Sequence, residues 1–229
     1  MAQDKRRMKI KVTKNGPYIV TGGVPLKEKI IVPKGKHYVF EEGRTLPQRE
    51  TYALCRCGKT KTPPFCDGTH GKIGFEGKET ASKAPYDERA ELIKGSGLNL
   101  LDDYRCALAR FCHRDKGTAW ELIENSEEEE NKQEAIRAAV ECPAGRITAV
   151  YKNGEKIEPD HEPEVVILQD PEMDVSSGIF VKGYIPIESE DGTLYETRNR
   201  VMLCRCGHSK NKPFCDASHI DEEYSDEDT

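Results

Sequence analysis

The 229-residue chain lacks long apolar runs and a basic excess, and each absence excludes a class of function. No stretch of about 18 apolar residues occurs, so we expect no membrane-spanning helix. The polar N-terminus has no apolar core of the kind that a signal peptide needs. The net charge of −6 argues against a nucleic-acid binder, which usually presents a basic face. We therefore expect a cytoplasmic protein with neither nucleic acid nor membrane among its partners.

Signatures of catalysis are also missing. The chain has no Gly-x-Gly-x-x-Gly dinucleotide fingerprint, no phosphate-binding Walker loop and no Ser–His–Asp signature, so we predict that it is not an enzyme. Apolar residues make up only 36%, which favours small cores supported by a bound metal over one large core. Cysteine, by contrast, is abundant. Nine cysteines, an odd number, indicate metal or cluster ligation, because disulfides are rare in the reducing cytosol.

An internal repeat organises the chain. The segment CRCGKTKTPPFCDGTH (Cys55–His70) recurs without gaps as CRCGHSKNKPFCDASH (Cys204–His219), and 10 of the 16 residues are shared. Upstream of each copy, GPYIVTGGVPL (Gly16–Leu26) aligns with SGIFVKGYIPI (Ser177–Ile187). The repeated unit is therefore larger than the cysteine motif, and we predict a duplicated domain.

We predict an α+β fold with three parts. They are a β-rich first repeat at 1–80, an α/β insert at 81–163, and a β-rich second repeat at 164–229 that ends in an acidic tail, Asp221–Asp228, exposed to solvent. In the repeats, β-branched and aromatic runs predict strands at Tyr18–Val20 and Ile179–Val181 and a hairpin joining Lys29–Val32 to His37–Phe40. No helix longer than about two turns is evident there.

The insert shows a different periodicity. Leu98–His113 and Asn131–Glu141 carry apolar residues at helical spacing, so we predict two helices. Gly145–Ile157 has the pattern of a hairpin that turns at Lys152–Gly154.

The duplicated motif has the spacing of a two-iron site. Cys55 and Cys57 point the same way from an extended segment, because side chains alternate along a strand, and they can chelate one iron. Cys66 and His70 stand four residues apart on one face of a helical turn, which suits a second iron. We expect Asp67 to cap that turn rather than to bind iron.

This pattern resembles the CDGSH iron–sulfur domain family (mitoNEET-like). The resemblance implies two 2Fe–2S clusters, one held by Cys55, Cys57, Cys66 and His70 and the other by Cys204, Cys206, Cys215 and His219. It also implies one-electron transfer or redox-linked cluster storage and transfer, with a redox or cluster-acceptor protein of unknown identity as partner. Single-repeat members of the family dimerise, so we expect the tandem repeats to form a pseudo-dimer within one chain. Ala217 departs from the family pattern, which has glycine there.

Zinc is the alternative ligand, in a zinc-stabilised interaction module without redox activity. Zinc sites usually use Cys-x2-Cys pairs, whereas both copies here have Cys-x-Cys. We expect His208, inside the second loop, to be a surface residue.

Three further cysteines lie in the insert. Cys106 and Cys112 are six residues apart and Cys142 precedes a proline, which resembles a bacterial ferredoxin pattern with Ala109 in place of its second cysteine. The resemblance to a divergent mono-cluster ferredoxin-like domain implies a third cluster, 3Fe–4S or 4Fe–4S, with His113 or solvent as a further ligand. The other possibility is that these are buried free cysteines that pack the insert.

Overall fold

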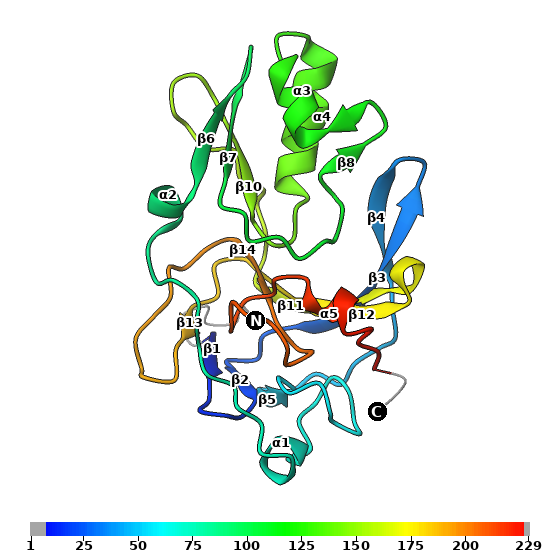
Figure 1. Ribbon diagram of the computed structural model, residues 1–229, viewed down its shortest axis with the longest axis vertical. Helices are drawn as coiled ribbons and strands as arrows, with labels where there is room; N and C mark the ends of the chain where they lie inside the picture. The colour runs from blue at the N-terminus through cyan, green and yellow to red at the C-terminus, as the bar shows by residue number, and fades with distance from the viewer. Residues whose placement is uncertain (1–7, 227–229) are drawn as a thin grey trace.

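A computed structural model describes residues 8–226 of the chain, so the first seven residues and the last three, 227–229 of the acidic tail, lie outside it. The fold is mixed α/β and consists mostly of strands with a few helices (Figure 1). Over the described range, no helix is long and apolar enough to cross a membrane.

The two repeats build two sheets. The first has the order β13-β1-β2-β5 and contains β13 (Ile187–Glu188), β1 (Lys9–Val12), β2 (Tyr18–Thr21) and β5 (Thr51–Leu54). The second has the order β14-β12-β11-β3-β4 and contains β14 (Arg200–Leu203), β12 (Val175–Lys182), β11 (Glu164–Asp170), β3 (Leu26–Lys34) and β4 (His37–Glu42). The strands predicted at 18–20 and 179–181 and the hairpin of β3 and β4 are thus confirmed.

Each sheet contains a strand that belongs to the other repeat. β3 of the first repeat pairs in parallel with β11 of the second, with Leu26 opposite Val165. β13 of the second repeat pairs in parallel with β1 of the first, with Ile187 opposite Ile10. Ile10 and Val165 each donate a 2.9 Å backbone hydrogen bond to the proline that precedes the partner residue. Because Leu26 and Ile187 align in sequence, the exchange of strands is reciprocal.

The two sheets share one apolar core. In β2 the side chains of Tyr18 and Val20 are buried while their neighbours are half-buried, as expected for a strand with one face on the core. They pack with Ile179, Val181 and other side chains of the five-stranded sheet in a single cluster. Fully burying such a side chain contributes about 1.5–3 kcal/mol. Exchanged strands thus bring the apolar faces of both repeats together.

The insert covers the opposite face of the five-stranded sheet. Val166 and Phe180 on that face pack against Ala107, Ala109 and Phe111 of the insert. β12 is therefore buried almost throughout, with seven of its eight residues in the interior. In Figure 1 the insert lies above this sheet.

The insert itself has a three-stranded sheet, a two-stranded ribbon and short helices. The strands are β6 (Glu91–Lys94), β7 (Asn99–Asp102) and β10 (Ile147–Val150), in the order β10-β7-β6, with β8 (His113–Arg114) beside β9 (Gly117–Thr118). The helices are α2 (Tyr86–Arg89), α3 (Ala119–Glu124) and α4 (Glu129–Val140). α4 confirms the helix predicted at 131–141. The predicted turn at Lys152–Gly154 is also confirmed, since Gly154 N donates to Tyr151 O.

The helix predicted over Leu98–His113 is wrong. Leu98 and Leu100 are buried in strand alternation, and so are Ala107, Ala109 and Phe111. Between and beside them the backbone takes left-handed φ values of 62° at Tyr104, 52° at Leu108 and 65° at Arg110, which no α-helix accommodates. The apolar residues of this segment fit two alternating runs as well as they fit a helix. The helix α3, which begins with a Thr118–Glu121 capping box, was not predicted.

Both repeats end in a helix of only four residues, in agreement with the sequence: α1 (Thr69–Lys72) and α5 (Ser218–Asp221). The acidic tail differs from the expectation, because Tyr224 and Asp226 are buried. Asp226 forms an ion pair with the buried Arg205. A buried cation requires such a partner, and the tail supplies it.

Gly58 and Gly207 bring the two cysteine loops into direct backbone contact. A Cβ on Gly58 would lie 2.3 Å from the carbonyl oxygen of Cys206, and one on Gly207 would lie 2.7 Å from that of Cys57. Both glycines have left-handed φ values, 71° and 88°. Glycine is required twice over, for its conformation and for its missing side chain.

We predict that Gly58→Ala lowers the free energy of unfolding by about 2–4 kcal/mol, since overpacking costs about 1–3 kcal/mol and left-handed strain about 1 kcal/mol. Urea unfolding measures this loss. The matched control is Gly68→Ala, because Gly68 has φ 86° but a Cβ there meets nothing within 4 Å. The second repeat already carries Ala217 at that place, with φ 72°. Equal losses in the two variants would contradict the importance of the loop contact.

Candidate metal centres

Each motif begins with two cysteines whose sulfur atoms face one another. β5 ends at Leu54 and leads directly into Cys55 and Cys57, whose Sγ atoms lie 3.7 Å apart. β14 leads in the same way into Cys204 and Cys206, with 3.5 Å between the Sγ atoms. All four are buried, as the alternation of an extended segment predicts for side chains on one face.

A cysteine and a histidine form the second half of each motif. Cys66 Sγ lies 3.3 Å from His70 Nδ1, and Cys215 Sγ lies 3.4 Å from His219 Nδ1. α1 and α5 carry the two histidines, but the cysteines precede these helices, which begin only after the left-handed Gly68 and Ala217. A turn, and not one face of a helix as predicted, therefore brings the sulfur and the nitrogen together. Gly68 N also donates to Cys66 Sγ at 3.4 Å.

Equivalent hydrogen bonds close the two loops. Cys55 N donates to Pro64 O at 2.8 Å, and Cys204 N donates to Pro213 O at 2.9 Å. Hydroxyls at matching places, Thr60 and Ser209, donate at 2.6 Å and 2.7 Å to the carbonyl of the phenylalanine five residues later. These bonds link the two halves of each motif.

Asp67 does not cap the helix as predicted, because the N-cap position belongs to Gly68 and no side chain caps it. Instead Asp67 joins the two arms of the loop. Its Oδ2 accepts from Lys61 N at 3.0 Å and its Oδ1 from Thr69 N at 2.9 Å. These two backbone donors hold the pKa of Asp67 well below its usual range. Asp216 makes the matching pair of bonds in the second repeat.

Between the paired cysteines of each motif lies a buried arginine, whose role was not predicted from the sequence. Arg56 is 1% exposed and donates to the carbonyls of Gly16, Gly77 and Thr13 at 2.7–2.8 Å. Arg205 is 2% exposed and donates to Ser177 O at 2.6 Å. The repeated Cys-Arg-Cys is the signal that could have identified them. They tie the segment between the paired cysteines to backbone carbonyls elsewhere in the same repeat.

One thiol of each pair ionises easily. The hydrogen bond from Cys57 lowers the pKa of Cys55 to about 6, and that from Cys206 lowers the pKa of Cys204 to about 7. The same bonds, together with burial, raise the pKa of Cys57 and of Cys206. Each pair therefore shares one proton near neutral pH and offers a thiolate, the form that binds metals.

The donors of each motif fit two metal ions better than one. Among residues 8–226, no group of three or more His, Cys, Asp or Glu side chains is close enough to hold a single ion. Each motif instead presents a sulfur–sulfur pair and a sulfur–nitrogen pair. Cysteine sulfur is a soft donor suited to iron–sulfur clusters, and a 2Fe–2S cluster takes two protein ligands on each iron. The donor set therefore fits such a group.

The two sites differ in how deeply they are buried. Cys66 and His70 are half-buried, whereas Cys215 and His219 are 4% and 2% exposed. The insert covers the second site, since Cys215 belongs to the same apolar cluster as Ala107, Ala109 and Phe111 of the insert. The neighbouring Phe214 is also covered, by the Arg105 guanidinium 4.6 Å from its ring centroid.

The second histidine is buried with one ring nitrogen unpaired. Among the described residues, His219 Nε2 and Ser177 Oγ are both buried and have no hydrogen-bond partner. Ser177 aligns with Gly16, where an added Cβ would lie 3.6 Å from His70 Nε2. Burial lowers the pKa of His219 to about 4. His208 is an exposed surface residue, as expected, and pairs with Glu222 at 3.2 Å.

The three cysteines of the insert meet at one cavity. Cys106, Cys112 and Cys142 line it together with Ala109 and Trp120. Leu108 N donates to Cys106 Sγ at 3.3 Å, an arrangement made possible by its left-handed backbone. Burial raises the pKa of Cys112 to about 12 and also raises that of Cys142.

His113, the expected further ligand of this cavity, is exposed on β8 and is not among the residues that line it in the described chain. That expectation is wrong, because the β8–β9 ribbon turns the residue outward. Arg146 does line the cavity, and it interacts with Cys106.

The paired sulfur and nitrogen donors, present twice, define a protein with a duplicated metal-binding site. The family described as "iron-binding zinc finger CDGSH type" matches residues 15–71 and 177–220. Both repeats therefore belong to the CDGSH family, whose members bind iron–sulfur clusters, and the insert separates the two matched regions. No curated protein and no solved structure matches the chain.

The unequal burial predicts unequal thiol reactivity in metal-free protein. Iodoacetamide should alkylate Cys66 at least about tenfold faster than Cys215, because burial limits access to Cys215 and raises its pKa. Mass spectrometry of peptides after timed labelling measures both rates. Labelling in urea is the control, in which the two rates should converge. Equal rates in the folded protein would contradict the difference in cover.

Proposed function

We propose that the protein binds two 2Fe–2S clusters and acts in one-electron transfer or in redox-linked cluster storage and transfer, as a carrier rather than an enzyme. The ligands are Cys55, Cys57, Cys66 and His70 in the first site and Cys204, Cys206, Cys215 and His219 in the second. The observation that carries the proposal is the duplicated set of two donor pairs at 3.3–3.7 Å. Such a cluster, when bound, accepts and releases a single electron.

The surrounding residues support this role. Hydrogen bonds from the backbone N–H groups of Gly58 and Gly207 favour the anionic form of Cys55 and of Cys204. The N–H bond from Gly68 to Cys66 Sγ does the same at the second pair. A neutral histidine in place of a fourth thiolate makes each ligand set less negative, which raises the reduction potential.

The two repeats act as one unit in this proposal, a pseudo-dimer within a single chain. Three reciprocal features support it: the exchanged strands β3 and β13, their matched backbone bonds, and the mutual contact of Gly58 and Gly207. Tyr18 adds a further link, since its hydroxyl lies 2.7 Å from the carbonyl oxygen of Cys204 in the other repeat.

The insert, in the same proposal, is a ferredoxin-like domain with a third cluster, 3Fe–4S or 4Fe–4S, held by Cys106, Cys112 and Cys142. The shared cavity and the Leu108 N–H bond to Cys106 support it. Cys106 also lies close enough to Cys215 to act on it electrostatically. The insert site and the second CDGSH site are thus neighbours, as an internal electron relay requires.

The first site is then the one that exchanges its cluster with a partner protein. Cys66 and His70 are half-buried, and within the described residues Cys66 does not belong to the apolar cluster in which Cys215 packs with the insert. The second site is enclosed by the insert, so its ligands open only when the insert moves. The difference in exposure therefore supports cluster exchange at the first site and cluster retention at the second.

Anaerobic purification tests the binding proposal. We expect a coloured protein with about two irons and two sulfides for each CDGSH motif. We also expect additional iron and sulfide from the third cluster, which a variant with serine at Cys106, Cys112 and Cys142 should lose. An EPR signal in the oxidised protein identifies a 3Fe–4S centre, since oxidised 2Fe–2S clusters are silent. Colourless protein that retains zinc would overturn the function, and unchanged iron in the triple variant would overturn the third site alone.

Single-site variants test the division of roles. Cys215→Ala keeps the first site and Cys66→Ala keeps the second, so each variant holds one CDGSH cluster. We expect the chelator bathophenanthroline to remove iron from the Cys215→Ala protein about tenfold faster, a ratio that needs only about 1.4 kcal/mol of extra opening cost at the second site. Visible absorbance follows the loss in both proteins. Equal rates, or a faster second site, would contradict this assignment.

A further inference from the structure

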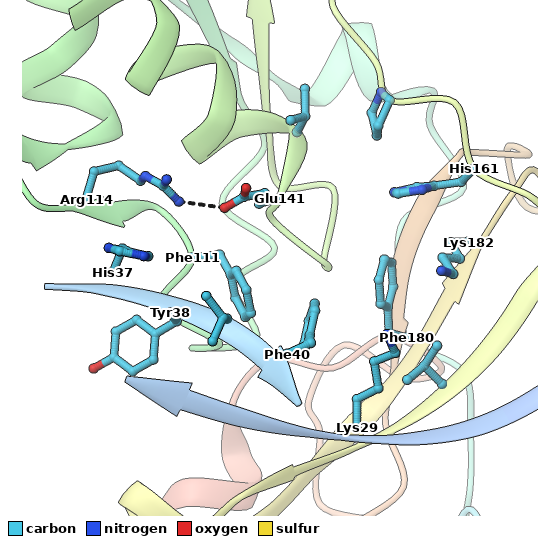
Figure 2. A pocket seen from close by; sticks show the side chains of 14 residues that line it. Lys29, His37, Tyr38, Phe40, Phe111, Arg114, Glu141, His161, Phe180 and Lys182 are labelled. Atoms are coloured by element: carbon cyan, nitrogen blue, oxygen red, sulfur yellow. Dashed lines mark hydrogen bonds and ion pairs between the residues drawn. The ribbon is translucent and has the colours of Figure 1, made fainter. Parts of the chain in front are cut away.

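A cavity of about 360 Å³ lies where the insert meets the edge of the five-stranded sheet. Figure 2 shows the side chains that line it, which come from β3, β4, β11 and β12 and from the insert. Its volume falls in the range of small-molecule sites. None of the residues proposed above as ligands of an iron–sulfur cluster lines this cavity.

Aromatic rings form the apolar wall of this cavity. Phe40 and Phe111 have ring centroids 4.4 Å apart at 32°, and Phe40 and Phe180 are 6.3 Å apart at 24°. His161 meets Phe180 edge-on at 6.3 Å. Phe111 and Phe180 are buried, but Phe40 is only half-buried. Phe40 is stacked on Phe180 and tilted against Phe111, and these rings beside an open space suit a flat aromatic molecule.

Two lysines stand at the His161 end of the cavity, as Figure 2 shows. Lys182 contacts Glu164 at 2.8 Å, but Lys27 shares that carboxylate at the same distance, so two cations meet one anion. Lys29 contacts Glu42 at 3.2 Å. Each ammonium has three N–H donors and keeps some of them for another acceptor. This end therefore favours an anionic group.

The opposite end is already neutralised. Arg114 is paired with Glu141 at 2.5 Å and with Glu134 at 2.9 Å, and His37 lies 3.2 Å from Asp115. The cavity thus has one end that still favours negative charge, an aromatic wall, and one end whose arginine is already paired with carboxylates.

We propose that this cavity is a binding site for a planar aromatic carboxylate or sulfonate, with its rings against Phe40, Phe111 and Phe180 and its anionic group at Lys182 and Lys29. The site does not depend on iron, so it can be tested on metal-free protein. Since Phe111 directly precedes Cys112, a bound ring system would lie beside the insert cavity.

Titration calorimetry with 2-naphthoate as the probe tests the proposal on the full chain. We expect a dissociation constant on the order of 100 µM, typical of a ligand of this size. Cyclohexanecarboxylate keeps the charge but not the flat ring, and 2-naphthamide keeps the ring but not the charge. Both should bind at least about fivefold more weakly. No binding of 2-naphthoate at about 1 mM would overturn the proposal.

Lys182→Met and Lys27→Met form a matched pair of variants. Each removes one of the two lysines that contact Glu164, but only Lys182 lines the cavity. We expect Lys182→Met to weaken 2-naphthoate about tenfold, the effect of losing a charge-assisted hydrogen bond, and Lys27→Met to leave it unchanged. Equal weakening in the two variants would place the ligand elsewhere and overturn the assignment.

Phe40→Leu tests the aromatic wall independently of charge. We expect it to weaken 2-naphthoate about fivefold while cyclohexanecarboxylate changes little. Circular dichroism and urea unfolding establish that each variant is folded, and Lys29→Met replaces Lys182→Met if that variant is not. Unchanged 2-naphthoate binding in Phe40→Leu would contradict the stacking on this wall.

Discussion

The contact between the two cysteine loops is the constraint on which the rest of the structure depends. Gly58 and Gly207 each lie against the backbone of the opposite motif, so the two loops fit only when both repeats are fully formed. Strand exchange enforces this, because neither sheet is complete with the strands of one repeat alone. The ligand pairs project from strands and helical turns fixed by that assembly, which explains why equivalent hydrogen bonds recur in both loops.

The two cysteine motifs have similar backbones but different surroundings. The five-stranded sheet has a second apolar face, on which side chains of the insert pack. As a result Cys215 of the second motif is enclosed by the insert, while Cys66 and His70 of the first motif remain half-buried. The tail adds a further difference, since Asp226 forms an ion pair with Arg205 in the second repeat, whereas Arg56 in the first donates to three carbonyl oxygens and lies over the rings of Tyr18 and Phe75. The two cysteine loops therefore have similar backbones but differ in solvent exposure and in the charged groups around them.

Local features of the fold were predictable because they depend on local residues. The duplicated motif, the strands at 18–20 and 179–181, the β3–β4 hairpin and α4 all follow from spacing and turn residues. The exchange of β3 and β13 does not follow from the sequence. Equivalent strands of the two repeats carry equivalent residue patterns, so pairing within a repeat and pairing between the repeats fit the pattern equally well. The apolar spacing of Leu98–His113 fits both periods and so predicts a helix as readily as two strands. The left-handed backbone of Leu108 and Arg110 has no signal in side-chain type. The role of the buried arginines and of Asp226 depends on tertiary contacts, which pattern alone does not reveal.

Joining the two repeats in one chain has a consequence for how the sites can change over time. In a pair of identical subunits every substitution appears at both sites, so the two remain copies. Here each motif has its own codons. Glycine can stand beside His70 while the aligned Ser177 occupies the other repeat, and Ala217 can replace a glycine in one loop only. The covalent link that holds the two repeats together also leaves each of them free to diverge.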